Sequence, residues 1–191
     1  MATTTKKEDI LHKAALLFHQ KGYTATTMRE LATAVGIEAS SLYNHIKSKE
    51  ELLTNICFIN AKKFSEGMNG AVLLNDSPTA KLSLLIKQHI DIALQDKTSM
   101  TVFDDEWKHL SEPHLSSFLQ TRKEYQKGFC TIIEEGIKNG EIQDLPSNLI
   151  MNTIISSLRW IHFKPDSAKK ANTAKLHEQI VSLLMKGIAN K

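Results

Sequence analysis

Several features that would mark a membrane, secreted or zinc-binding protein are missing from the sequence. No stretch reaches the roughly 20 consecutive apolar residues of a membrane helix, and the N-terminal segment has no apolar core like that of an export signal. The two cysteines, Cys57 and Cys130, form neither a CxxC pair nor a Cys/His zinc spacing, so neither a disulfide framework nor structural zinc is expected. We therefore expect a cytoplasmic protein with reduced thiols and no cofactor.

The excess of positive charge is also small. The formal net charge is +3 and the isoelectric point is near 8.8, a balance that permits nucleic-acid binding without indicating it. Residues 1–50 hold seven basic and five acidic side chains, so most of the excess lies in this segment. The distribution of charge therefore directs attention to the start of the chain.

Apolar residues recur at helical spacing through nearly the whole chain, which has only four prolines. Because almost no segment alternates with the period of two that strands require, the pattern predicts an all-α fold. Two capping boxes, Thr27 to Glu30 and Ser48 to Glu51, mark the starts of helices. The expected helices cover residues 7–21, 27–36, 38–46, 48 onward, 78–97, 102–110, 113–140, 147–163 and a last segment after 165.

Residues 27–46 have the pattern of a helix-turn-helix. Ala32 is small where the second helix must cross closely, and Gly36 can adopt the positive φ that ends the first helix. Leu42 is placed to fill the angle between the two helices. The amphipathic helix expected before this segment would complete a core of three helices.

A set of residues in the first quarter of the chain resembles a known family. The set comprises Gly22-Tyr-Thr-Ala-Thr-Thr27, Leu31-Ala32, Val35-Gly36-Ile37, Leu42-Tyr43 and Lys47-Ser-Lys-Glu-Glu-Leu-Leu53. It is similar to the N-terminal signature of TetR-type transcriptional repressors over about residues 8–53. The resemblance implies a DNA-binding domain of residues 1–50 and a larger helical domain of residues 51–191 for ligand binding and dimerisation. It also implies a ligand-responsive repressor that binds a palindromic DNA operator as a homodimer.

The resemblance implies roles for individual side chains in DNA binding. The helix expected over 38–46 is similar to the family's recognition helix, whose side chains enter the major groove. The implied contacts to base edges come from Ala39, Ser40, Ser41 and Asn44. The implied phosphate contacts come from Thr27, Tyr43, His45 and Lys49, and Arg29 completes the DNA-binding set. These types suit the roles, because a hydroxyl-capped helix N-terminus attracts phosphate and asparagine pairs with adenine.

Two positions depart from the family's common residues. Glu38 stands where serine is frequent, and Ser40 stands where glycine is frequent. A carboxylate beside DNA repels phosphates unless it accepts a hydrogen bond from cytosine N4, so both departures bear on operator sequence and affinity. The alternative interpretation of the segment is a helical hairpin that only packs, with a solvated basic face.

The larger domain has charged and aromatic residues within its apolar stripes. Arg122 is a candidate to receive a carboxylate or phosphate, and the alternative is an arginine that reaches water from a helix edge. His89 is either a ligand contact or a core histidine with a polar partner. Aromatic residues here either line a pocket or form core. The candidate pocket residues are His89, Phe103, Glu106, Trp107, Phe118, Arg122 and Trp160.

Two further segments bear on the effector and on dimerisation. Residues 106–114 together with 156–160 resemble the members of the family that sense acyl-CoA or related lipid metabolites, which implies an acyl-CoA or other apolar effector. The last two helices, about 147–163 and 172–189, have wide apolar faces and are the predicted homodimer surface.

A metalloenzyme and a DNA-independent helical adaptor are the alternatives from other classes. Glu106 and His109 have the spacing of a di-iron helical bundle, but the only similar pair, Asp9 and His12, lies in the DNA-binding segment. No Ser/His/Asp constellation, GxGxxG loop or P-loop can be identified. We therefore assign no catalytic residue and no metal ligand, and we expect a protein that is not an enzyme.

Overall fold

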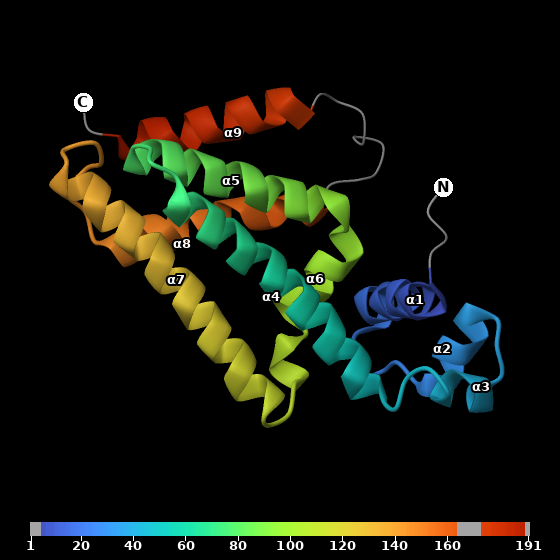
Figure 1. The fold of residues 1–191 in the computed structure, drawn as a ribbon. Coiled ribbons are helices and arrows are strands. Elements are labelled where there is room, and N and C mark those ends of the chain that lie inside the picture. Colours follow the sequence, from blue (N-terminus) through green and yellow to red (C-terminus); the bar gives the residue numbers. More distant parts are fainter. Residues whose placement is uncertain (1–4, 164–172, 190–191) are drawn as a thin grey trace. The chain divides into compact units, whose positions relative to one another are not determined.

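The computed structural model describes residues 5–163 and 173–189, and within these ranges it is all-helical apart from one isolated bridge (Figure 1). The predicted all-α fold is confirmed. No helix in the described ranges is long and apolar enough to cross a membrane. The elements are α1 (Lys6–Lys21), α2 (Met28–Val35), α3 (Ala39–Tyr43), α4 (Lys49–Leu73), α5 (Pro78–Gln95), α6 (Lys97–Asp105), η1 (Trp107–His109), α7 (His114–Lys138), α8 (Ser147–Leu158), η2 (Arg159–Phe163) and α9 (Thr173–Ile188).

Three helices differ from their expected bounds for local reasons. The sixth begins five residues earlier than expected, because the Asp96 side chain accepts a hydrogen bond from the Ser99 backbone N–H at 3.0 Å and caps it. The eighth turns into the 3₁₀ helix η2 after Leu158. The start predicted for the last helix after residue 165 lies outside the described residues, and α9 is described from Thr173.

The chain divides into two compact units. The first contains α1, α2, α3, the N-terminal half of α4, α6, η1 and the start of α7. The second contains the remainder of α4 and α7 together with α5, α8, η2 and α9. The boundary expected after residue 50 is a functional division taken from the family resemblance, and it stays a prediction.

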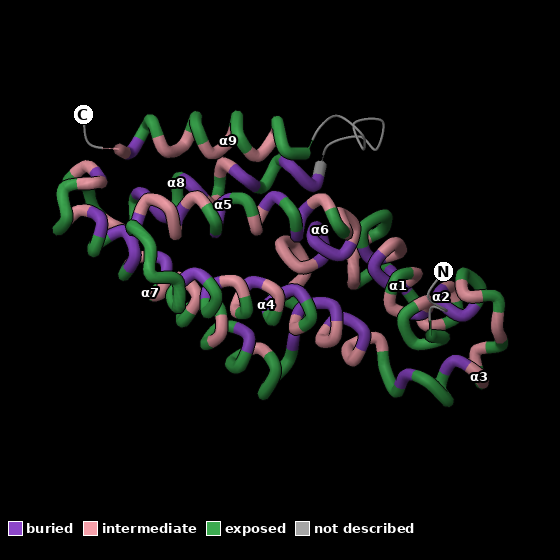
Figure 2. The backbone as a smooth tube through the Cα atoms, turned by 45° about the horizontal axis from the view of Figure 1, so that its top comes forward, coloured by how far each residue is buried: buried purple, intermediate pink, exposed green. Residues whose placement is uncertain are grey.

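The first unit has a core to which every one of its helices contributes. The α1 helix buries one face, including Ile10, Ala14 and Phe18, and it packs against both α2 and α6. Leu31 of α2 and Leu42 of α3 are buried in the same cluster, and Figure 2 shows buried positions on both helices. Because α2 and α3 are too short to be stable alone, burial of these apolar side chains is what holds them.

The second unit is built around α5, which packs against α8, η2 and α9. A glycine of α4 leaves room there for a side chain of α5. A β-carbon at Gly67 would lie 1.6 Å from the amide of Gln88, and this amide donates a hydrogen bond to the Lys63 carbonyl at 3.1 Å. The absence of a side chain at Gly67 therefore leaves the space that the Gln88 side chain occupies. The end of α9 is connected to the segment between α7 and α8, because the Gln143 N–H donates a hydrogen bond to the Ile188 carbonyl at 2.9 Å.

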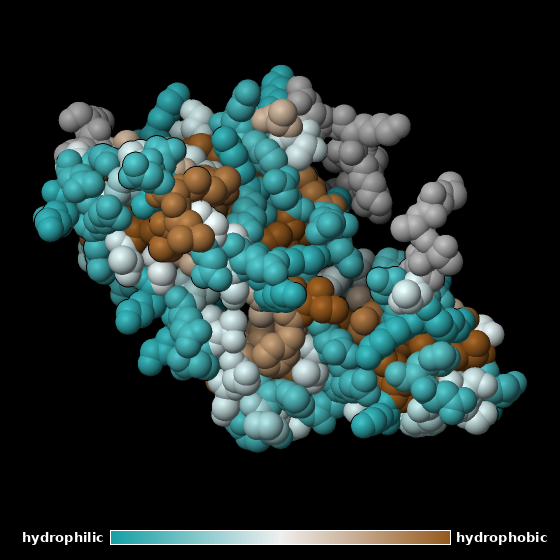
Figure 3. Space-filling view, in the orientation of Figure 1, coloured by the Kyte–Doolittle hydropathy of each residue, from teal (hydrophilic) through white to brown (hydrophobic). Residues whose placement is uncertain are grey.

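Two leucines that differ in burial provide a test of the core. Leu42→Ala is expected to lower the free energy of unfolding by about 2–5 kcal/mol, because the side chain is fully buried and its removal leaves a cavity. Leu73→Ala is the matched control: Leu73 is 85% exposed at the C-terminal end of α4, where apolar side chains reach the surface (Figure 3). The control is expected to stay within about 0.5 kcal/mol. Denaturant unfolding measures both, and equal losses would contradict the packing described.

Candidate nucleic-acid interface

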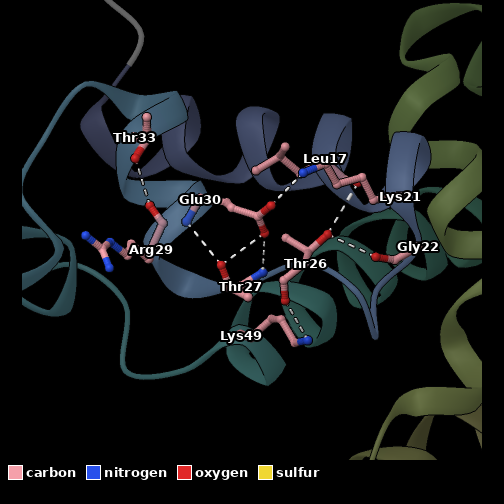
Figure 4. Close-up of polar contacts among 9 residues, drawn as sticks. All are labelled: Leu17, Lys21, Gly22, Thr26, Thr27, Arg29, Glu30, Thr33 and Lys49. Atoms are coloured by element: carbon pink, nitrogen blue, oxygen red, sulfur yellow. Dashed lines mark hydrogen bonds and ion pairs between the residues drawn. The ribbon is translucent and has the colours of Figure 1, made fainter.

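The N-terminus of α2 is fixed by the predicted capping box, which is confirmed. The Thr27 hydroxyl accepts from the Glu30 backbone N–H at 3.2 Å, and the Glu30 carboxylate accepts from the Thr27 backbone N–H at 2.9 Å (Figure 4). Lys21, at the end of α1, donates to the same carboxylate at 2.5 Å. The hydrogen bond from Lys21 and the backbone N–H of Thr27 together lower the pKa of Glu30 to about 2. One carboxylate therefore connects the end of α1 to the start of α2.

The turn between α2 and α3 has the conformation that the sequence predicts. Gly36 has φ 74° and ψ 35°, the left-handed region that glycine enters at no steric cost. Its N–H donates to the Thr33 carbonyl at 3.1 Å, and the Ile37 N–H donates to the Ala32 carbonyl at 3.0 Å. Leu42, fully buried, lies in the core that α2 and α3 share. The relative direction of the two helices is thus set by backbone geometry and by one side chain.

The α3 helix is shorter than the predicted range 38–46. After Tyr43 the chain tightens, since the His45 N–H donates to the Leu42 carbonyl, three residues back, at 3.0 Å. Asn44 and His45 therefore lie in the turn that follows the helix. Glu38, at the N-cap, is exposed and makes no capping hydrogen bond.

Most of the side chains that the family resemblance assigns to DNA are exposed. Those exposed are Thr27, Arg29, Ser40, Tyr43, Asn44 and His45, whereas Ala39, Ser41 and Lys49 are half-buried. Tyr43 exposes 54% of its surface, and Arg29 points away from the other contacts (Figure 4). Exposed hydrogen-bonding side chains therefore lie on α3 at Ser40 and Tyr43, and they continue at Asn44 and His45 in the turn after it.

The start of α4 departs from the expected capping box in one contact. The Ser48 hydroxyl accepts from the Glu51 backbone N–H at 3.1 Å, as predicted. The Glu51 carboxylate accepts instead from the Lys47 N–H, at 2.8 Å. A Lys7 ammonium lies 3.8 Å from the same carboxylate, so α1 and α4 are also connected by charge.

Both halves of the chain match one family of regulators. Residues 10–56 match the bacterial regulatory proteins of the tetR family, and residues 75–188, more than half of the chain, match the Tetracyclin repressor-like C-terminal domain. The chain belongs to the TetR family. It is therefore a DNA-binding transcriptional repressor and not an enzyme, and the sequence predictions of this class are confirmed.

Individual relatives agree with this assignment. The HTH-type transcriptional repressor KstR2 of Mycolicibacterium smegmatis is 29% identical over a match that covers 96% of this chain and 91% of that protein. The structure of the ketosteroid transcriptional regulator KstR2 of Mycobacterium tuberculosis has a TM-score of 0.91 at 22% identity, with 99% and 97% of the two chains covered. AibR in complex with isovaleryl coenzyme A and operator DNA has a TM-score of 0.80 at 20% identity, with 95% and 98% covered. At these identities the two structures show a shared fold.

Three of the pocket candidates of this TetR repressor lie together in an aromatic cluster of the first unit. The Phe118 ring centroid lies 5.6 Å from that of Phe103 and 5.9 Å from that of Trp107. Glu106 is adjacent to Trp107 in the chain, and its carboxylate lies 3.3 Å from the His109 Nε2.

No group of three or more His, Cys, Asp or Glu side chains in the described residues is arranged to hold a metal ion.

His89 lies in the second unit and has a polar partner there. Its Nε2 lies 2.5 Å from the Tyr125 hydroxyl. The centroids of the His89 and Phe64 rings are 4.6 Å apart. Loss of hydration lowers the pKa of His89 to about 4, so the imidazole is neutral at pH 7. The side chains of Arg122 and Trp160 are exposed. Tyr125 was not singled out from the sequence, where it reads as one more apolar position of the long seventh helix.

The Glu30 contact gives a prediction that nuclear magnetic resonance can check. Because the pKa of Glu30 in the folded protein lies below the ordinary value of 4.5, the stability that this carboxylate contributes is complete above pH 4.5 and is lost as the pH falls through about 2. The Glu30 side-chain carbon is expected to titrate near pH 2. Lys21→Ala is expected to raise this midpoint. Lys47→Ala, which replaces an exposed lysine that does not contact Glu30, is the control and is expected to leave the midpoint unchanged. A wild-type midpoint at 4.5 would contradict the geometry.

Proposed function

We propose that this TetR repressor binds a pseudo-palindromic operator as a homodimer and that a small apolar or acyl effector releases it. The observation that carries the proposal is the group of exposed polar side chains on α3 and in the turn after it. These side chains belong to a helix-turn-helix in which the Gly36 turn and the buried Leu42 fix the direction of α3. Such a frame presents side chains to the major groove without further ordering. We expect it to act in the compartment that holds the DNA, the cytoplasm.

Base contacts and phosphate contacts are divided along the same surface. We assign Ser40, Ser41 and Asn44 to base edges, with the Ala39 methyl beside them for contact with a thymine methyl. The exposed Thr27, Arg29, Tyr43 and His45 are assigned to the DNA backbone, where they set position more than sequence. Glu38 either accepts from a cytosine amine or repels phosphate, so it affects which base pair is preferred.

The dimer is proposed to form through the last two helices. Large apolar side chains remain exposed on α8, η2 and α9; these are Leu149, Trp160 and Leu183. Two helices from each copy would bury them in a bundle of four, which supplies the two-fold symmetry that a palindrome requires. Two recognition helices would then meet the DNA about one helical turn apart.

The effector is proposed to be an acyl-CoA or a related lipid metabolite. The support is the similarity of residues 106–114 and 156–160 to regulators of that class and the fold shared with AibR, whose structure holds isovaleryl coenzyme A and operator DNA. Effector binding would favour a dimer geometry in which the two DNA-binding units no longer fit the half-site spacing. The candidate pocket residues stay predictions.

Selection from random duplex DNA tests the DNA-binding proposal. We expect the purified protein to enrich a palindrome with half-sites about one turn apart, because a two-fold symmetric dimer reads two copies of one sequence. Asn44→Ala is expected to relax the preference at particular base pairs, with a loss of about 1–3 kcal/mol at those positions. Tyr43→Phe, which removes one proposed contact to the DNA backbone, is the control and is expected to weaken binding to all sequences equally. Enrichment of a single asymmetric site would contradict the dimer.

The effector class is tested with the selected duplex and defined ligands. We expect isovaleryl-CoA or palmitoyl-CoA to weaken duplex binding by about 5- to 150-fold, since typical coupling between two sites has this size. Free coenzyme A, which lacks the acyl chain, is expected to leave the affinity unchanged. Fluorescence anisotropy of the labelled duplex measures all three, and an unchanged affinity with both acyl-CoA compounds would exclude this class.

A further inference from the structure

The ammonium group of Lys49, the first residue of α4, lies within a ring of backbone carbonyls. Its Nζ donates to the carbonyl oxygens of Tyr23 at 2.8 Å, Thr24 at 3.2 Å and Thr26 at 2.8 Å, all in the loop between α1 and α2. An ammonium group has three N–H donors and accepts no hydrogen bond. Three carbonyls therefore use all the donors that Lys49 has, and none is left for a phosphate oxygen.

The same ammonium group is also covered by an aromatic ring. Its Nζ lies 4.4 Å from the centroid of the Tyr23 ring, a distance typical of a cation–π contact. The Tyr23 ring is held in turn by an edge contact with Phe18, 5.2 Å between centroids, and by a stacked contact with His109, 5.5 Å between centroids. The first compact unit thus supplies a built site for one lysine head group.

The loop that binds Lys49 leads directly to the DNA-facing end of α2. Thr26 is buried, and its hydroxyl donates to the Gly22 carbonyl at 2.9 Å (Figure 4). The next residue, Thr27, is the N-cap of α2 and carries one of the assigned phosphate contacts. Without the ammonium group, three carbonyls lose their partner, and the loop that sets the position of Thr27 loses the contact that draws it together.

We propose that Lys49 is a positioning residue for operator binding, which holds the α1–α2 loop and the N-terminus of α2 in place and makes no phosphate contact of its own. The family resemblance implies a phosphate contact at this position, and the carbonyl ring argues against it. The inference rests on the proposed function, because its consequence for DNA appears as operator affinity.

Charge and geometry are separated by two substitutions at the same position. Lys49→Arg keeps the charge, but a planar guanidinium spreads its donors in a fork and cannot direct three of them from one nitrogen to three carbonyls. Lys49→Met removes the charge. A positioning role predicts that both variants weaken binding to the selected duplex by about tenfold. Retention of wild-type affinity by Lys49→Arg would overturn it.

The dependence of affinity on salt gives an independent measure of phosphate contacts. For the wild type and Lys49→Met, the slope of log affinity against log salt is expected to be equal, because the lost charge made no phosphate contact. A slope reduced by about one unit in Lys49→Met, which removes the charge, would show that Lys49 contacts a phosphate and would overturn the proposal. Tyr23→Leu and Tyr23→Phe extend the test without a change of charge: the first is expected to weaken binding, and the second, which keeps the ring, is not.

Hydrogen exchange in the full-length protein without DNA keeps the inference separate from the proposed function. Lys49→Met is expected to speed exchange of the Thr26 and Glu30 amides, whose hydrogen bonds lie in the loop and the cap. Lys47→Met, an exposed lysine two residues away, is the control and is expected to leave them unchanged. Unchanged exchange in Lys49→Met would overturn the positioning role. Failure of the wild type to select any operator would instead contradict the proposed function.

Discussion

In a short helix, most backbone N–H and carbonyl groups lie near an end and have no partner within the helix. The DNA-binding part of this repressor depends on how those groups are satisfied. The α2 helix has eight residues and α3 has five, so internal hydrogen bonds pair few of their N–H and carbonyl groups. Glu30 and Thr27 satisfy one end of α2, and the Gly36 turn satisfies the other. The core thus packs against an α2 helix whose two ends are already paired, whereas the N-terminus of α3 has no side-chain cap.

Local signals explain what the sequence could predict. The α-helical periodicity, the Thr27 cap and the glycine at the end of α2 are encoded within a few residues, and all of them are found in the structure. The extent of α3 was predicted wrongly because apolar residues at Leu42 and Ile46 continue the helical spacing, while the backbone between them has already tightened into a turn. Burial continues past the helix end, so spacing alone overestimates its length.

Contacts between distant segments could not be predicted in the same way. Lys49 meets carbonyls 23 to 26 positions earlier in the chain, and backbone carbonyls are the same at every residue type, so no sequence pattern marks them. The pairing of His89 with Tyr125 likewise depends on how α5 and α7 are rotated against each other. An exposed-looking lysine and an ordinary tyrosine therefore acquire specific roles only through tertiary structure.

The place of Lys49 in α4 also has an electrostatic consequence. The N-terminus of an α-helix carries a partial positive charge, so a cation in the first turn is unfavourable for that helix. In α4 the same turn contains Glu50 and Glu51, the usual residues for this position. A lysine ahead of them weakens the start of a 25-residue helix in favour of a neighbouring loop. A substitution of Lys49 chosen to improve the helix propensity of α4 would therefore remove the hydrogen bonds that this lysine donates to the loop between α1 and α2.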